Sequence, residues 1–171
     1  KTSFKDLSTD YINDWMELLY ESTPVIKNEL INVYKPSPSA MVGVKRLLSE
    51  MLKHSHLENF KIESNGPEKS IYLNIIKGTG IHKYNGSKYE LKRPSEPGLM
   101  RLWDTWDSLI ENTKDDNDRI KISLLIQKAS EPPYGIKKGL AHFLSVVKIF
   151  SDLDQISVYH KKLSSEEYVY L

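Results

Sequence analysis

Apolar and polar residues alternate along this chain with the period of an α-helix over most of its length, which predicts a mostly helical protein. Apolar side chains recur every three or four positions in seven segments: residues 11–19, 25–34, 39–52, 68–77, 99–112, 119–130 and 137–152. Ser8 or Thr9 is a suitable N-cap for the first segment. The next three begin just after Pro24, Pro38 and Pro67, and proline is well tolerated at the first helical position.

Two further segments alternate apolar and polar residues with the period of a β-strand. Residues 81–91 contain Asn85-Gly86, a dipeptide typical of tight hairpin turns. Residues 155–159 and 167–170 flank a polar turn and predict a second hairpin. In both halves of the chain, helices therefore precede a two-stranded hairpin, which is the order of elements in a winged helix. We predict an α+β fold, mostly helical, built from tandem winged helix-turn-helix units.

The sharpest predicted turn lies in residues 131–139. Pro132 and Pro133 end the preceding helix because proline lacks an amide donor, and Gly135 can adopt a backbone conformation that other residues avoid. A new helix follows at once, so this segment predicts the corner of a helix-turn-helix. The predicted parts of the chain are an N-terminal helix (1–22), a first winged-helix unit (23–93), a linker (94–98) and a second winged-helix unit (99–171).

Composition excludes several classes of function. The 171 residues include no cysteine, which excludes disulfides, thiolate catalysis and cysteine-ligated zinc. We expect a reducing, cytoplasmic location and no association with a membrane, since no apolar run approaches the roughly 20 residues of a spanning helix. The chain begins at Lys1 without a methionine and ends on strand-like residues, so we expect it to be part of a longer polypeptide.

Residues that could carry catalysis do not form a recognisable motif. Gly78 and Gly80 close a predicted helix, whereas a phosphate-binding loop has Lys-Ser/Thr after its last glycine, at the start of a helix. His54 and His56 lie near Glu58, but a metal site would need a further ligand, and exposed loop histidines are the simpler interpretation. We expect no enzymatic activity and no cofactor for this chain itself.

Basic residues cluster in two places that a winged helix presents to nucleic acid. The net charge of the whole chain is only +1, but residues 65–100 hold six lysines and arginines against three acids. The third helix of a winged helix enters the major groove and its hairpin touches the backbone, so we predict contact with double-stranded DNA. The candidate nucleic-acid-binding residues are Lys77, Lys83, Tyr84, Lys88, Lys92, Arg93, Lys137, Lys138, His142 and Lys148.

Several stretches from residue 23 onward have a characteristic combination of residues. They are residues 23–31 (TPVIKNELI), 65–72 (NGPEKSIY), 80–82 (GIH), Trp103 and 131–139 (EPPYGIKKG). Together they resemble a region of very large bacterial ATP-hydrolysing proteins of phage-defence islands, the BREX-type ATPases. The resemblance implies a noncatalytic, cytoplasmic region downstream of a nucleotide-binding engine, in a protein that recognises or restrains foreign DNA. Its partners would be other domains of the parent protein or other subunits of the defence system.

The resemblance implies no catalytic residue, because this chain lacks the Walker motifs that would perform the chemistry. The residues that match it are expected to shape the fold, with a helix starting at residue 67 and a corner at residues 133–135. They are Asn28, Glu29, Pro67, Glu68, Tyr72, Pro133, Tyr134 and Gly135.

A second interpretation belongs to another class of function. The lysines could serve only to keep exposed faces soluble, and the winged helices could be rigid supports for binding a protein. Aromatic residues are frequent anchors at such interfaces, and Trp15 lies on a helix that also carries Asp10, Asp14 and Glu17. This alternative predicts a protein-protein interaction or oligomerisation module that does not bind nucleic acid.

Overall fold

The computed structural model describes residues 4–113, 119–161 and 168–170. Its helices are α1 (Phe4–Leu19), α2 (Pro38–His54), α3 (Pro67–Ile71), α4 (Pro97–Glu111), α5 (Ile122–Ser130) and α6 (Lys138–Ser151). A 3-10 turn, η1 (Glu58–Lys61), precedes α3, and a π-helical segment, η2 (Tyr72–Lys77), continues it. The strands are β1 (His82–Tyr84), β2 (Tyr89–Leu91), β3 (Tyr159–Lys161) and β4 (Tyr168–Tyr170). These elements confirm the predicted α+β, mostly helical class.

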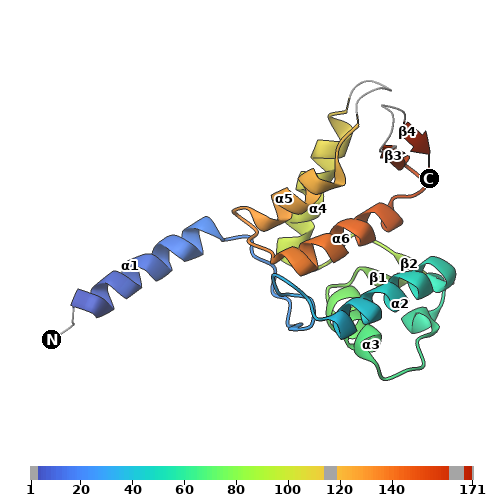
Figure 1. Ribbon diagram of the computed structural model, residues 1–171, viewed down its shortest axis with the longest axis horizontal. Coiled ribbons are helices and arrows are strands. Elements are labelled where there is room, and N and C mark those ends of the chain that lie inside the picture. The colour runs from blue at the N-terminus through green and yellow to red at the C-terminus, as the bar shows by residue number, and fades with distance from the viewer. Residues whose placement is uncertain (1–3, 114–118, 162–167, 171) are drawn as a thin grey trace.

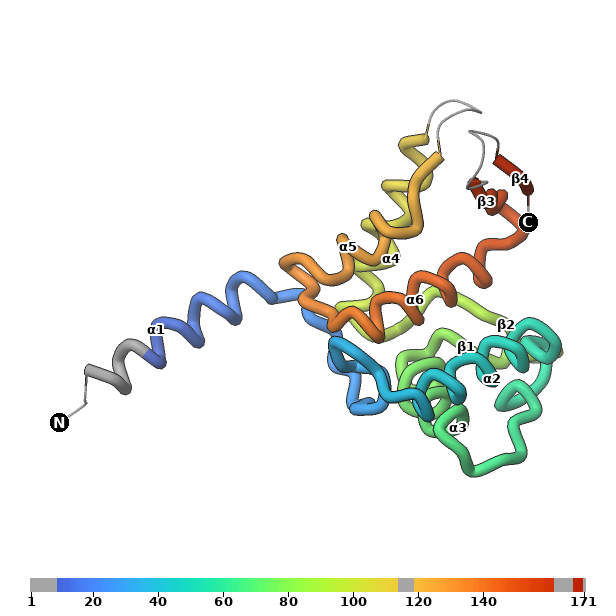
Figure 2. The backbone as a smooth tube through the Cα atoms, viewed as in Figure 1, coloured from blue at the N-terminus to red at the C-terminus, as the bar shows by residue number. Residues whose placement is uncertain are grey.

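The elements form a two-lobed body from which one helix projects (Figures 1 and 2). One lobe contains α2, α3 and the hairpin β1–β2, and the other contains α4 and α5 (Figure 1). Helix α6 lies between the lobes, and β3–β4 follow it at the C-terminal end (Figure 1). Helix α1 extends away from the body, so the N-terminal part of the chain is an arm (Figure 2).

The predicted helix over residues 25–34 is wrong, because this part of the chain is an extended segment that ends in turns. Exposed and buried residues alternate from Glu21 to Asn28, which is the period of an extended chain. The Asn28 side chain then accepts hydrogen bonds from the amides of Leu30, at 3.1 Å, and Ile31, at 3.3 Å. An asparagine side chain that binds nearby amides competes with helical hydrogen bonds, and this turn ends any helical tendency.

The helix over residues 39–52 forms as predicted, because its start has a local cap. The Ser37 hydroxyl accepts a hydrogen bond from the Ala40 amide at 3.2 Å, and Pro38 occupies the first helical position. Helix α3 begins at Pro67, also as predicted. The first half therefore contains two packed helices before its hairpin instead of three, and tandem winged-helix units remain a prediction.

Both predicted hairpins are present among the described residues. In the first, Tyr84 pairs with Tyr89, and the Asn85 side chain accepts hydrogen bonds from the amides of Ser87 and Lys88. In the second, Tyr159 pairs with Tyr170. Its first strand begins at Tyr159, so it starts where the predicted strand was expected to end.

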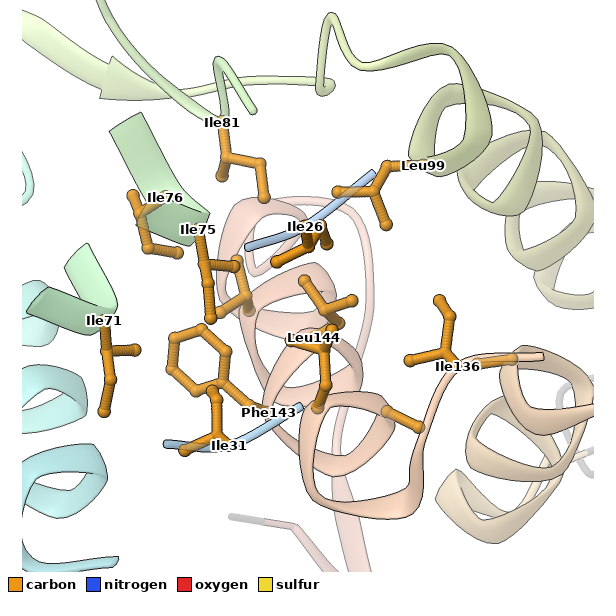
Figure 3. Packing of buried hydrophobic residues seen from close by; sticks show 14 of the residues in the cluster. Ile26, Ile31, Ile71, Ile75, Ile76, Ile81, Leu99, Ile136, Phe143 and Leu144 are labelled. Carbon is orange, nitrogen blue, oxygen red and sulfur yellow. The ribbon is translucent and has the colours of Figure 1, made fainter. Parts of the chain in front are cut away.

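A single hydrophobic core joins the two halves of the chain (Figure 3). One buried cluster contains Phe143 and Leu144 of α6 together with three residues of the first half: Ile31, in the turns before α2, Ile75 and Ile81. Because residues from both halves of the chain line this one core, the two predicted units share a single interior.

The predicted linker, residues 94–98, is part of this packed structure. Pro94 and Gly98 are buried, and the Glu96 carboxylate accepts hydrogen bonds from the amides of Leu99, at 2.7 Å, and Val25, at 3.1 Å. A Cβ atom at Gly98 would lie 2.7 Å from the backbone of Pro24, so only glycine permits this approach. Residues 94–98 therefore connect α4 to the extended segment that contains Pro24 and Val25.

The predicted corner between α5 and α6 is confirmed. Gly135 has a φ of +61°, a left-handed conformation that favours glycine, and the Pro132-Pro133 peptide bond is cis. The Tyr134 hydroxyl donates to the carbonyl of Arg101 at 3.0 Å and therefore accepts from the Thr105 hydroxyl at 2.7 Å. These bonds fix the corner on α4.

Candidate interaction site

Three of the predicted DNA-binding cations near the first hairpin have carboxylate partners. The Lys92 ammonium lies 2.5 Å from a Glu90 carboxylate oxygen, and that of Lys77 lies 3.9 Å from Glu58. Arg93 contacts Asp104 and Asp107 on α4 and donates to the Met100 carbonyl at 3.0 Å. Their charges are thus largely compensated within the chain, which weakens the attraction of this region for phosphate.

The tip of the hairpin leaves fewer groups available to nucleic acid. Lys88 is exposed and Lys83 is half-buried, and neither forms an ion pair within the described part of the chain. The Tyr84 ring is exposed, but its hydroxyl donates to the Gly86 carbonyl at 2.9 Å. Two lysines and one tyrosine are therefore the remaining candidates on this hairpin.

The predicted exposed position of Lys148 is wrong. Its side chain is only 3% exposed, and its ammonium contacts Asp107 and lies 2.5 Å from Asp152. Helix α6 lies between the two lobes, so the face that carries Ser145 and Lys148 is covered as well as the apolar face. Lys148 and Arg93, from different predicted clusters, meet at the same carboxylate, Asp107.

The first turn of α6 keeps its predicted exposure. Lys137, Lys138 and His142 are exposed, and the Lys138 ammonium lies 5.9 Å from the centre of the Tyr34 ring. His142 donates from Nδ1 to the Lys138 carbonyl at 2.7 Å. No hydrogen bond or ion pair among the described residues connects this group with the cations of the first hairpin.

Helix α1 has the most exposed apolar face of the described chain. Trp15 is 63% exposed and Tyr11 is 67% exposed. With 100° between successive residues, these two lie on one side of the helix together with Ile12, Met16, Leu18 and Leu19, which are also exposed. Asp10, Asp14 and Glu17 are exposed on the remaining, polar side of the helix, where Asp14 lies nearest to the apolar side. The helix is amphipathic, yet no part of the described body covers its apolar face.

The base of α1 is fixed to the α5–α6 corner. The Ser22 amide donates to the Pro133 carbonyl at 3.2 Å. A Cβ atom at Gly135 would lie 2.7 Å from the Tyr20 ring, so the absence of a side chain at this glycine makes room for the tyrosine. The arm therefore leaves the body in a defined direction. Sequence patterns show that α1 is amphipathic but not that its apolar face is unpartnered.

A buried aromatic group around His82 links α2, η2 and the first hairpin. His82 donates from Nε2 to the Ser55 carbonyl at 2.8 Å, and the Tyr72 hydroxyl donates to Nδ1 at 2.8 Å. Burial raises the pKa of Tyr72 to about 12, so this donor keeps its proton. Burial lowers the pKa of His82, as does Lys77 to a smaller extent, while the Ser55 carbonyl acts in the opposite direction. The ring is therefore neutral in the folded protein at pH 7.

We expect the stability of the chain to fall as the pH decreases from 7.5 to 5.5. The unfolded state binds a proton at His82 with a pKa near 6.5, whereas the folded state binds it only at lower pH, so acid favours unfolding. The slope is at most about 1.4 kcal/mol per pH unit for one group. Urea unfolding at several pH values measures it. His82→Gln should flatten the slope; a slope equal to that of the wild-type chain would contradict this assignment.

The described residues contain no group of three or more His, Asp or Glu side chains placed to hold a metal ion. The Nε2 atom of His54 lies 3.6 Å from Oε2 of Glu50, and the ring centre of His54 is 6.5 Å from that of His56.

Within the described ranges, no helix has the length and apolar character needed to cross a membrane. No family model matches the chain, and no curated protein or solved structure does so either. The function must therefore be inferred from the surfaces of the chain itself.

Proposed function

We propose that this chain is a noncatalytic protein-interaction module of a larger protein and that α1 is its docking element. The observation that carries the proposal is the exposed apolar face of α1, centred on Trp15. Burial of one large apolar side chain contributes about 1.5–3 kcal/mol, so several on one helix can offset an association cost of about 4–15 kcal/mol. The two-lobed body serves as the rigid support that aims this helix.

The length of α1 supports the same proposal. Helix α1 has 16 residues and packs on the body only near its end. A helix of this length without tertiary packing is only marginally stable in water, because most helical stability in proteins comes from burial of an apolar face. Docking on a partner supplies that burial.

Contact with DNA is the less favoured function. The predicted cations Lys77, Lys92, Arg93 and Lys148 have carboxylate partners, and Asp10, Asp14 and Glu17 add negative charge to the arm. Phosphate contacts require cations that can replace counterions, and half of the predicted lysines and arginines are already paired with carboxylates. For the parent protein we propose a cytoplasmic ATPase of prokaryotic phage defence, which the resemblance of residues 23–139 to BREX-type ATPases supports.

A photocrosslinking experiment tests the docking role of α1. A benzophenone amino acid replaces Met16 on the apolar face, or Asp10 on the polar side of the helix as a matched control, in cells that produce the chain. We expect a protein adduct of one defined mass from position 16 and none from position 10. Adding Tyr11→Asp and Trp15→Asp should remove that adduct, because these changes remove the apolar face without altering the body.

The opposite outcome is equally specific. If position 16 yields no protein adduct, and the purified chain is retained by duplex DNA at moderate salt, the proposal is wrong. In that case Lys83→Ala with Lys88→Ala should reduce retention and lower the salt dependence by roughly 0.9 for each phosphate that is no longer neutralised.

A further inference from the structure

An apolar groove lies between α2, α6 and the turns that precede α2. Met41, Val44 and Leu48 line it from α2 at spacings of three and four, and Phe143 and Val146 line it from α6. Its volume is about 480 Å³. The three α2 residues at helical spacing and the two α6 residues three positions apart offer apolar surface to one face of a further helix.

The floor of the groove is rigid because the turns before α2 are pinned to α6. The Gly139 amide donates to the Val33 carbonyl at 3.0 Å. A Cβ atom at Gly139 would lie 2.6 Å from the Ile31 carbonyl oxygen and 2.6 Å from the Pro36 ring, so the backbones are in direct contact there. The groove is thus a preformed feature of the fold, which lowers the cost of binding.

The rim of the groove is basic. Lys35, Lys45 and Lys138 are lining residues with exposed side chains, and His142 lies beside them. None of these three lysines has a carboxylate partner among the described residues, and no acidic residue of the described chain lines the groove. An apolar floor with three uncompensated positive charges at its edge selects an acidic amphipathic helix.

Helix α1 has the complementary composition. Its exposed apolar face suits the apolar floor, and its polar side carries Asp10, Asp14 and Glu17, of which Asp14 borders the apolar face, so the negative charge of the helix complements the positive rim. Complementary charges of this kind fix the register and orientation of a helix in its groove. The same chain therefore carries an acidic helix whose apolar face is uncovered and a basic groove that no helix of the described chain fills.

We propose that α1 of one copy of this chain binds in the α2–α6 groove of a second copy. The proposal rests on the proposed docking role of α1 and names its partner. The arm does not reach its own groove, since it points away from the body (Figure 2) and Tyr20 and Ser22 hold its base against the α5–α6 corner. A 16-residue helix is about 24 Å long, which is enough to bridge two bodies. The exchange is reciprocal, because two arms and two grooves then close a symmetric dimer.

A charge exchange between arm and groove tests this proposal. The groove variant carries Lys35→Glu, Lys45→Glu and Lys138→Glu, and the arm variant carries Asp10→Lys, Asp14→Lys and Glu17→Lys. A control variant carries Lys27→Glu, Lys53→Glu and Lys61→Glu, which are exposed lysines outside the groove. Sedimentation at about 50 mM salt gives the dissociation constant of each, and circular dichroism confirms that each is folded.

We expect the wild-type chain and the control variant to dimerise. The groove and arm variants should each dimerise at least about 100-fold more weakly, because like charges then face each other across the interface. An equimolar mixture of these two variants should recover a dimer, since each lysine arm meets a glutamate groove and each acidic arm meets a lysine groove. The arm variant mixed with the control variant, which has the same net charge as the groove variant, should give no mixed dimer, because a lysine arm then meets a lysine groove; a mixed dimer there would show that net charge alone drives recovery.

Quenching by acrylamide provides a second readout. Trp103 and Trp106 are buried, so added quencher acts on Trp15, and dimer formation should protect it. A wild-type chain that stays monomeric overturns the proposal, whether Trp15 is exposed or is covered by the chain's own groove. A dimer that persists unchanged in the groove variant also overturns it. If the crosslink at position 16 then joins a different protein, the docking role of α1 stands although the second copy is wrong.

Discussion

Trp106→Ala is expected to lower the free energy of unfolding by about 3–5 kcal/mol, the largest effect of any single core substitution proposed for this chain. The side chain is fully buried on α4, and its Nε1 donates to the Leu125 carbonyl at 3.0 Å. Removal of the indole leaves a cavity between α4 and α5 and a buried carbonyl without its donor, and both changes destabilise the fold. Urea unfolding followed by circular dichroism measures the change.

The neighbouring tryptophan offers a matched control. The Trp103 ring lies 5.0 Å from that of Trp106, but within the described structure its Nε1 has no hydrogen-bond partner. Trp106→Phe should therefore cost about 1–3 kcal/mol more than Trp103→Phe, because only the first leaves a buried partner unsatisfied. Equal losses in the two phenylalanine variants would show that the bond to Leu125 contributes nothing.

The double substitution Asp107→Asn with Asp152→Asn is expected to cost about 3–5 kcal/mol. It leaves the Lys148 ammonium buried without a counter-charge, and Lys148 is almost inaccessible to water. Arg93 loses one partner but keeps Asp104, and that exposed pair contributes little. The penalty therefore comes from Lys148. The free energy of unfolding of the double variant, measured at pH 7, tests the prediction.

Lys148→Met separates the charge from the packing of the side chain. Alone it should cost less than the double substitution, because the two carboxylates that remain are partly exposed and can be hydrated. Added to the double substitution, it should recover most of the missing stability, since a well-packed apolar group can replace a buried ion pair. No recovery in the triple variant would mean that the carboxylates stabilise the fold in another way. Binding to DNA should be unaffected by Lys148→Met.

Helix ends, turns and hairpins were predictable because their signals are local. Ser37 caps α2 and precedes Pro38, and Asn85-Gly86 forms the first hairpin turn through backbone and side-chain bonds within a few residues. Gly135 adopts the left-handed conformation expected at the corner. Each of these interactions joins residues that are near one another in the sequence, so the pattern of residue types is sufficient to predict them.

Contacts between distant residues were not predictable from spacing. The apolar pattern of residues 25–34 suits a helix, but the segment is held extended by bonds such as that from the Val25 amide to Glu96, 71 residues away. Lys148 follows the spacing of an exposed face, yet its ammonium is buried and contacts the carboxylate of Asp107, 41 residues away. Neither Glu96 nor Asp107 can be identified as a partner from the periodicity of the segment that contacts it.

The sequence by itself determined the helical class, the positions of the hairpins, the corner at Gly135 and the amphipathic character of α1, because these follow from residues within one or two turns of each other. Only the tertiary structure decided which amphipathic faces are covered. The face of α6 is enclosed between two lobes, whereas that of α1 projects into water. Burial depends on where the chain places its other segments, and for this protein that placement leaves Trp15 exposed and the α2–α6 groove open.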